Sequence, residues 1–540
     1  MSAADYVITD AAIWTGSGGW ATGLAIRGDR ITAVTTGDDE LRSWMGPDTE
    51  VVPQPGRLVV PGFQDAHIHA PFAGRNRLHV FLNDLYSRAD YLGAVAEYAQ
   101  ANPDEEWIVG GGWAMEHFPG GNPRRQDLDA VVPDRPVFLM NRDIHGAWVN
   151  TRALEVAGIE TDTPDPPDGL IVRDPDGTPT GTLHEGAAYR FQSDVLPPPS
   201  RADWEAAIIE AQTYLHSLGI TAWQDAWVTP ETQHAYESLA RQGRLTAHVV
   251  GAQWWDRYRG LDQIDEFLTR RESGSVGHFR ASAVKIMTDG VIESRTAALT
   301  EPYCDGCGGH TDNYGLSYVD QDLLAAAVTQ LDALGFQVHM HAIGDRAVRN
   351  ALDAVAAARS ANGSNDLRHH IAHLQLVRPE DIPRFEQLGV VANCQSFWAQ
   401  SEPQMDELTI PFIGRDRAQR QYPFADLLSA GTVLAGGSDW SVTTADPLQE
   451  VEVMVNRIDP DHRDNAPFLP EQCVPLHAAM AAFTSGSAFV NHDDDAGILA
   501  VGRRADLAVL DRNVFTEPVT RISDARVVAT FASGRPVFGA

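Results

Sequence analysis

Lysine is almost absent from this chain of 540 residues. Lys285 is the only lysine, and arginine supplies the rest of the 41 basic side chains. Against them stand 74 acidic residues, which leave a formal net charge of −33. Such a charge repels the phosphate backbone of nucleic acids and the anionic surface of a membrane. We therefore expect no nucleic-acid partner and no membrane partner.

Cysteine and long apolar runs are also scarce. Four cysteines in 540 residues do not make a disulfide framework. Cys304 and Cys307 form a single C-x-x-C pair, which is weak evidence for zinc and equally fits a loop with two free thiols. The N-terminal stretch lacks a signal-peptide pattern, and no run of about 18 apolar residues occurs. These features predict a soluble, cytoplasmic protein.

Short apolar runs separated by turn residues fill both ends of the chain. The N-terminal end contains YVITDAAIW and GLAIRGDRITAV, and the C-terminal end contains ILAVGRRADLAVLDRN and RVVATFASGRPVF. Such spacing is typical of β-rich units, but neither end is long enough for a stable sheet alone. We therefore expect residues 1–57 and 497–540 to form one small β-sandwich domain together.

Between these ends, apolar runs alternate with helical stretches such as DWEAAIIEAQTYLHSLG. Continuous apolar strands that alternate with helices are typical of a parallel sheet buried on both faces. Residues 58–496 are therefore predicted to form a (β/α)₈ barrel of the TIM type, in the α/β class. Nine or ten apolar runs occur where the barrel needs eight, so we expect insertions near residues 71–135 and 159–200.

Metal-binding side chains stand at the ends of several predicted strands. His67 and His69 are two residues apart in DAHIH, so on a strand both imidazoles point to the same face. His341, His373 and Asp439 end three further apolar runs. The carboxyl ends of the strands form the catalytic face of a (β/α)₈ barrel. Any one of these histidines could be a hydrogen-bonded core residue, but their agreement in position predicts a metal site.

Lys285 lies inside the apolar run ASAVKIMTDG, where an unpaired ammonium would be costly. Burial favours the neutral amine, which can take up carbon dioxide to form a carbamate whose two oxygens bridge two metal ions. A guanidinium cannot do this. This explains why one lysine persists in a chain that otherwise uses arginine. The alternative is a lysine that forms a salt bridge with Asp289 or Asp439.

Seven longer motifs then point to a known family. They are PGFQDAHIH, DIHGAWVN, GTPTGTLHEGA, VKIMTDGVIESRTAAL, HAIGDRAV, GSDW and GRRADLAVLD, and the resemblance runs from about residue 6 to residue 535. Together with the order of the metal-binding residues, they resemble the amidohydrolase superfamily. More narrowly, the chain is similar to the amidohydrolase 3 branch, which includes N-substituted formamide deformylases and YtcJ-like proteins.

The resemblance implies a role for each metal-binding residue. His67 and His69 would hold one divalent ion together with Asp439, and His341 and His373 would hold a second. Carboxylated Lys285 would bridge the two ions, and Zn²⁺ is the expected metal. Paired ions make hydroxide available near neutral pH, and Asp439 would pass its proton to the leaving nitrogen of an amide.

Other side chains near the predicted strand ends are candidates for binding a small-molecule substrate. Arg295 could fix a carbonyl or carboxylate through paired hydrogen bonds, although an ordinary surface ion pair explains it as well. The tryptophans would suit an apolar substituent, or could be simple packing. The full set of substrate-binding candidates is Trp113, His145, Glu185, Trp227, Ser294, Arg295 and Gln395.

Three functions remain open at this point. The first is hydrolysis of a linear N-substituted amide, a carbon–nitrogen bond other than a peptide bond. The second is a related reaction on the same barrel, by a cyclic-amide hydrolase, a deaminase or a lyase. The third is regulation by a metal-binding protein without turnover. A homodimer is the expected assembly.

Overall fold

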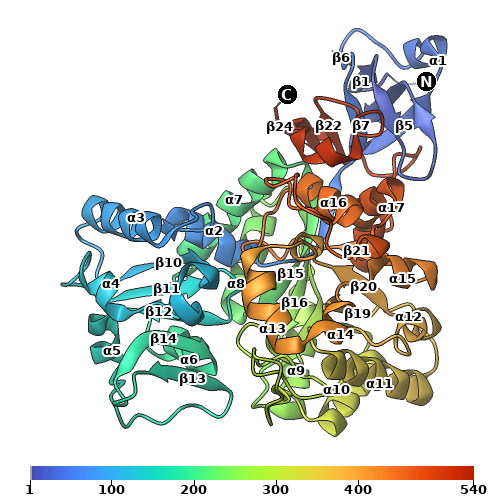
Figure 1. The fold of residues 1–540 in the computed structure, drawn as a ribbon. Coiled ribbons are helices and arrows are strands. Elements are labelled where there is room, and N and C mark those ends of the chain that lie inside the picture. Colours follow the sequence, from blue (N-terminus) through green and yellow to red (C-terminus); the bar gives the residue numbers. More distant parts are fainter. Residues whose placement is uncertain (1–2, 540) are drawn as a thin grey trace.

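An eight-stranded parallel sheet forms the centre of the molecule in the computed structural model, which describes residues 3–539 (Figure 1). Its strands neighbour one another in chain order: β8 (Phe63–Ile68), β15 (Ile220–Val228), β16 (His248–Trp254), β17 (Phe279–Met287), β18 (Gln337–Ala342), β19 (His370–His373), β20 (Val391–Cys394) and β21 (Leu434–Gly436). Just beyond the strand ends, the Asp439 N–H donates to the His67 carbonyl at 2.8 Å, which joins the last strand to the first. The predicted α/β barrel of the TIM type is confirmed.

Helices cover the outside of this sheet. In α10 (Gln321–Ala333), Leu324, Val328 and Leu331 are buried at helical spacing and pack in the main core. The other long helices on the barrel are α7 (Arg201–Ser217), α8 (Pro230–Arg241), α9 (Ile264–Ser273), α11 (Asp345–Asn362) and α16 (Pro447–Asn456). Among residues 3–539, no helix is long and apolar enough to cross a membrane.

A second sheet of six strands is inserted between β8 and β15 and lies beside the barrel, at the left of Figure 1. Its order is β13 (Gly169–Arg173), β14 (Pro179–Glu185), β12 (Gly146–Val149), β11 (Val137–Asn141), β10 (Ile108–Trp113) and β9 (Val80–Phe81). Helices α2 (Ala70–Leu78), α3 (Arg88–Ala101) and α5 (Thr151–Ala157) belong to the same stretch of chain. The apolar run around β11 is therefore a strand of this sheet. Without it, the nine runs of the sequence reduce to the eight strands of the barrel.

Two smaller sheets bring the ends of the chain together at the top of Figure 1. One has the order β5 (Arg30–Thr35), β4 (Gly23–Arg27), β1 (Tyr6–Thr9) and β6 (Glu50–Pro53). In the other sheet, β7 (Leu58–Pro61) pairs antiparallel with β22 (Leu507–Leu510). The remaining strands of this sheet are β2 (Ala12–Trp14), β3 (Trp20–Ala21), β23 (Val527–Ala532) and β24 (Arg535–Phe538). Side chains from both ends of the chain share one apolar core, which includes Ile8, Leu24, Leu507 and Phe531.

Candidate active site

The carboxyl ends of β8 and β21 bring two histidines and an aspartate together. His67 is the fifth residue of β8, and His69 follows the strand directly. Their Nε2 atoms lie 3.2 Å and 3.0 Å from the same Asp439 oxygen, Oδ1. Asp65 supports this arrangement, because its Oδ1 accepts from the backbone N–H groups of His67 and Ser438. All three metal-binding candidates are buried.

Two further histidines come from β18 and β19. The imidazole rings of His341 and His373 lie 4.5 Å apart between centroids, and the His373 ring lies 4.9 Å from that of His67. His341 Nδ1 donates to Asp289 at 3.0 Å, which leaves Nε2 as its free nitrogen. Asp439 and His373 have φ angles of 56° and 77°, a left-handed conformation that is strained in residues other than glycine.

The donor atoms of this cluster fit a divalent metal ion. Ligand atoms of His67, His373 and Asp439 all lie within 4.8 Å of one another. Two buried atoms, Asp439 Oδ1 and His69 Nδ1, have no hydrogen-bond partner among the described residues. Burial and the nearby Lys285 lower the pKa of His67 to about 3, so its imidazole is neutral, as a metal ligand must be. Imidazole and carboxylate are ligands that zinc prefers.

Lys285 lies on β17 with its side chain in the same cavity as these ligands. It is 1% exposed, and burial lowers its pKa to about 7, although the Asp439 charge opposes the shift. Among residues 3–539, no carboxylate lies within 4.0 Å of its amine. Asp289, one of the partners considered above, instead accepts from His341 and from backbone N–H groups. The amine is therefore buried without a salt bridge.

A hydrogen-bonded chain beneath the cluster fixes the tautomer of His67. The His67 Nδ1 atom lies 2.8 Å from His339 Nε2, and His339 Nδ1 lies 2.7 Å from the side-chain oxygen of Gln224. Because that oxygen can only accept, His339 donates through Nδ1 and accepts from His67 through Nε2. His67 then carries its proton on Nδ1 and presents the lone pair of Nε2 to the cluster.

His145 faces the cluster from the inserted sheet. Its Nδ1 lies 3.0 Å from Glu185 Oε2, at the end of β14. Burial opposes the charged imidazole, but the Glu185 carboxylate raises the pKa of His145 to about 9. Thr296 and Ser294 donate to the other Glu185 oxygen at 2.7 Å and 3.3 Å. Glu185 and Ser294 thus hold His145 in place and do not line the cavity themselves.

Of the remaining substrate-binding candidates, some line the cavity in the structure and others do not. Trp227 lines the cavity beside the cluster and stacks on Trp254 at 4.6 Å. Gln395 lines the cavity on the other side of the cluster, but its side-chain amide already accepts from the His373 N–H at 2.6 Å and donates to Asn393 at 2.8 Å. Trp113 is completely buried in the core of the inserted sheet, where its indole donates to the Leu139 carbonyl. The prediction for Trp113 is therefore wrong.

Arg295 was also expected to bind the substrate, but it does not line the cavity. Its side chain is exposed, and its guanidinium lies 4.2 Å from the centre of the Phe412 ring. The turn that holds Arg295 at φ 59° directs the side chain away from the cavity. Cys304 and Cys307, on the following loop, are free thiols, and neither belongs to a group of three metal-binding side chains among residues 3–539.

Several residues that line the cavity were not among those predicted from the sequence. Asp143 precedes His145 by two residues and lines the cavity on both sides of the cluster. Others come from helix α6 (Gly186–Asp194), from short helical turns, from a strand end and from loops, namely Tyr189, Trp254, Glu293, Gln375, Trp398, Gln404 and Tyr422. Asp143 and Glu293 lie inside the motifs DIHGAWVN and VKIMTDGVIESRTAAL, so their place in the sequence could have suggested them. The long chain between β20 and β21, which supplies three others, could also have been suspected, because long loops often form binding sites.

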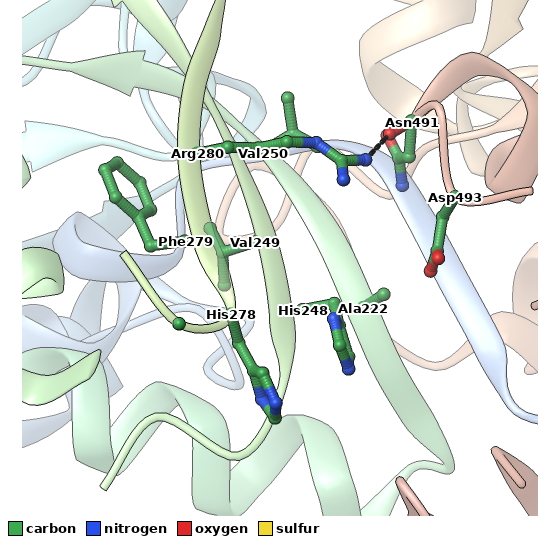
Figure 2. Close-up of a pocket in the computed structure, with 10 residues that line it drawn as sticks. Ala222, His248, Val249, Val250, His278, Phe279, Arg280, Asn491 and Asp493 are labelled. Atoms are coloured by element: carbon green, nitrogen blue, oxygen red, sulfur yellow. Dashed lines mark hydrogen bonds between the residues drawn. The ribbon is translucent and has the colours of Figure 1, made fainter. Parts of the chain in front are cut away.

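A separate cavity of about 60 Å³ lies at the opposite end of the barrel, where strands β15, β16 and β17 begin (Figure 2). His248 and His278 stack there with their ring centroids 4.0 Å apart. Arg280 donates to the Asn491 carbonyl, and Asp493 forms an ion pair with Arg504. The ring nitrogens of the two histidines contact Ser533 Oγ and the Thr246 carbonyl, so this cavity has a different chemistry from the cluster.

Comparison with known proteins agrees with this geometry. Residues 55–538 match the amidohydrolase family. The chain is 30% identical to YtcJ of Bacillus subtilis over 98% of this chain and 99% of that one, and 26% identical to the N-substituted formamide deformylase of Arthrobacter pascens over 95% and 94%. It is 27% identical to a solved metal-dependent hydrolase from Pyrococcus furiosus, with a TM-score of 0.72 and coverage of 94% and 99%. The chain is therefore a member of the amidohydrolase family.

Proposed function

We propose that this protein is a metal-dependent hydrolase that cleaves the carbon–nitrogen bond of a linear N-substituted amide. One observation carries the proposal: ligand-type side chains from separate barrel strands converge on a single buried cavity at the catalytic end. Membership of the amidohydrolase family supports hydrolysis, and the similarity to an N-substituted formamide deformylase supports the linear amide.

The proposal assigns each ligand a place. His67, His69 and Asp439 would hold one divalent ion, His341 and His373 would hold a second, and Lys285, as a carbamate, would be a ligand shared by both. Zn²⁺ suits this set of nitrogen and oxygen donors. When bound, such ions polarise a carbonyl and lower the pKa of water from 15.7 to about 7.

Two side chains of the protein would then move or hold protons. Asp439 directs Oδ1 toward the histidines, and its Oδ2 is left to accept a proton from the attacking water and deliver it to the leaving nitrogen. His145 is held through Nδ1 by Glu185, which leaves Nε2 to donate to the carbonyl oxygen of the substrate. The low exposure of both residues excludes bulk water from these transfers.

Turnover on a panel of formamides, acetamides, lactams and amino-heterocycles tests the proposal. We expect the metal-replete enzyme to hydrolyse linear amides and its Asp439→Asn variant to hydrolyse none. Turnover of lactams alone would favour a cyclic-amide hydrolase, and release of ammonia from amino-heterocycles would favour a deaminase. Failure on every class with the metal fully loaded would favour a regulatory protein.

A further inference from the structure

The metal ligands lie between two chambers of different chemistry. Both chambers are lined by Asp143, His145, His341, His373 and Asp439, so they meet at the cluster. We call the one that contains Trp227 the aromatic chamber and the one that contains Glu293 the acceptor chamber. A linear amide held at the cluster has two ends, and one end must enter each chamber.

The aromatic chamber presents flat apolar surfaces. Trp227 and Trp254 stack with a centroid distance of 4.6 Å and an angle of 21°, and Tyr189 meets Trp227 edge-on at 5.9 Å. Met287 and Ile144 complete the apolar wall. Aromatic side chains in this arrangement favour a planar or bulky apolar group.

The acceptor chamber contains a carboxylate without a cation. Glu293 Oε1 accepts from Thr409 Oγ1 at 2.6 Å, and among residues 3–539 no basic side chain lies within 4.0 Å of the Glu293 carboxylate. Arg295, two residues away, contacts Phe412 instead. Burial raises the pKa of Glu293, and the nearby charge of Asp143 adds to the shift. Within the described chain the Glu293 carboxylate therefore has no directly paired cation, and a ligand could supply one.

Two more polar groups of this chamber have no hydrogen-bond partner among residues 3–539. Gln375 is 2% exposed, and its side-chain N–H donates to the Gln421 side-chain oxygen at 2.9 Å. Its own side-chain oxygen has no donor in the part of the chain that the structure describes. Tyr422 is 3% exposed, and within the described chain its hydroxyl makes no hydrogen bond. Both residues line the chamber with Glu293. Polar groups that line a cavity and lack a protein partner are satisfied by water or by a ligand.

We infer that the substrate is a linear amide with an aromatic or bulky apolar group at one end and a primary ammonium at the other. The apolar group lies against Trp227 and Trp254, and the ammonium donates to Glu293, Gln375 and Tyr422. An ammonium has three donors and one positive charge, which matches three acceptors and one uncompensated carboxylate. The inference rests on the proposed function, because it places the scissile amide between the chambers.

Matched amides test this inference. N-benzyl-3-aminopropanamide carries both groups, N-benzylbutanamide replaces the ammonium with a methyl group, and N-methyl-3-aminopropanamide lacks the ring. A reversed amide, with the ammonium on the amine side, completes the panel. We expect the ammonium to raise kcat/KM about 10- to 100-fold over the methyl analogue, which is the effect of a charge-assisted hydrogen bond. Equal rates for the two would overturn the inference.

The variant Glu293→Gln assigns the preference to one side chain. It should reduce the ratio of the two rates, ammonium amide over methyl analogue, to within about threefold of one. Glu407→Gln is the matched control and should keep the preference, because Glu407 is exposed on the helical turn Gln404–Thr409, which carries the Glu293 partner Thr409. An unchanged ratio in Glu293→Gln would overturn the inference.

Binding separates this inference from the proposed function. If the wild type hydrolyses none of the amides, the proposed function fails, and calorimetry with N-benzyl-3-aminopropanamide and N-benzylbutanamide decides the inference. Tighter binding of the ammonium form, lost in Glu293→Gln, supports it. Equal binding of both amides to the wild type overturns it.

Discussion

The two ends of the barrel both contain clustered histidines, yet only one end is arranged as a metal site. At the carboxyl end, His67 and His69 direct nitrogens at one Asp439 oxygen that, among residues 3–539, has no hydrogen-bond donor. At the amino end, His248 and His278 stack on each other, and their nitrogens contact a hydroxyl and a carbonyl (Figure 2). A metal site is thus recognised by where the free nitrogens point, and not by the presence of histidine.

The ends also differ in how their charges are balanced. At the amino end, Asp493 and Asp506 both pair with Arg504, with distances of 2.5 Å and 2.6 Å. At the carboxyl end, the buried Lys285 has no carboxylate within 4.0 Å among the described residues. Compensated charges stabilise a fold, whereas uncompensated ones indicate a missing ligand. The following predictions test this contrast.

The largest effect is expected from Asp439→Asn. The substitution keeps the volume of the side chain but removes the general base and one metal ligand, so kcat should fall at least 10³-fold. The fold should persist, because no donor within the described chain hydrogen-bonds Oδ1. Steady-state kinetics and circular dichroism measure the two effects. A variant that keeps more than about a tenth of the wild-type rate would require another base, and His145 is the next candidate.

The next effect is expected from His339→Phe, which removes the acceptor of the His67 Nδ1–H. Loss of such a partner typically weakens metal binding 10- to 100-fold. Competition with a chelator measures this affinity without reference to activity. His339→Gln should restore part of the affinity, because its amide oxygen can accept the same proton. Equal metal affinity in wild type and His339→Phe would show that the chain beneath the cluster is only structural.

A pH dependence follows from the buried amine. Lys285 has a pKa of about 7 in the metal-free protein, so the fraction of neutral amine rises roughly tenfold between about pH 6 and pH 8. Only the neutral amine takes up carbon dioxide, so reconstitution with zinc should speed up by a similar factor over this range. The measurement follows the return of activity at a constant concentration of dissolved carbon dioxide. A rate independent of pH would count against the carbamate.

The smallest effect is expected at the amino end. His248→Gln removes a stacked ring but retains a donor for Ser533, so metal content and kcat should stay within about threefold of wild type. The free energy of unfolding should fall by about 0.5–1.5 kcal/mol, as for a typical hydrogen bond or small packing change. Denaturant titration and metal analysis test both statements. Loss of metal in this variant would contradict the claim that the metal site lies at the carboxyl end and not at the amino end.

The features that could be predicted from the sequence are those that depend on the local pattern of apolar and polar residues. Strands buried on both faces read as continuous apolar runs, and His67, His341 and Asp439 follow such runs directly, so the barrel and its candidate ligands could be found. Trp113 was expected in the cavity because IVGGGW resembles a barrel strand, but this segment pairs with β11 in the inserted sheet. Glu293 was missed because its place in the acceptor chamber depends on packing against Thr409, far along the chain.

The metal content of the Lys285→Arg variant tests the central claim most directly. If a carbamate on Lys285 bridges two ions, the wild type should bind close to two zinc ions per chain with bicarbonate present. Lys285→Arg should then bind at most one and lose activity, because arginine brings a permanent positive charge beside the ions. An arginine variant that is active and holds as much metal as the wild type would contradict the account.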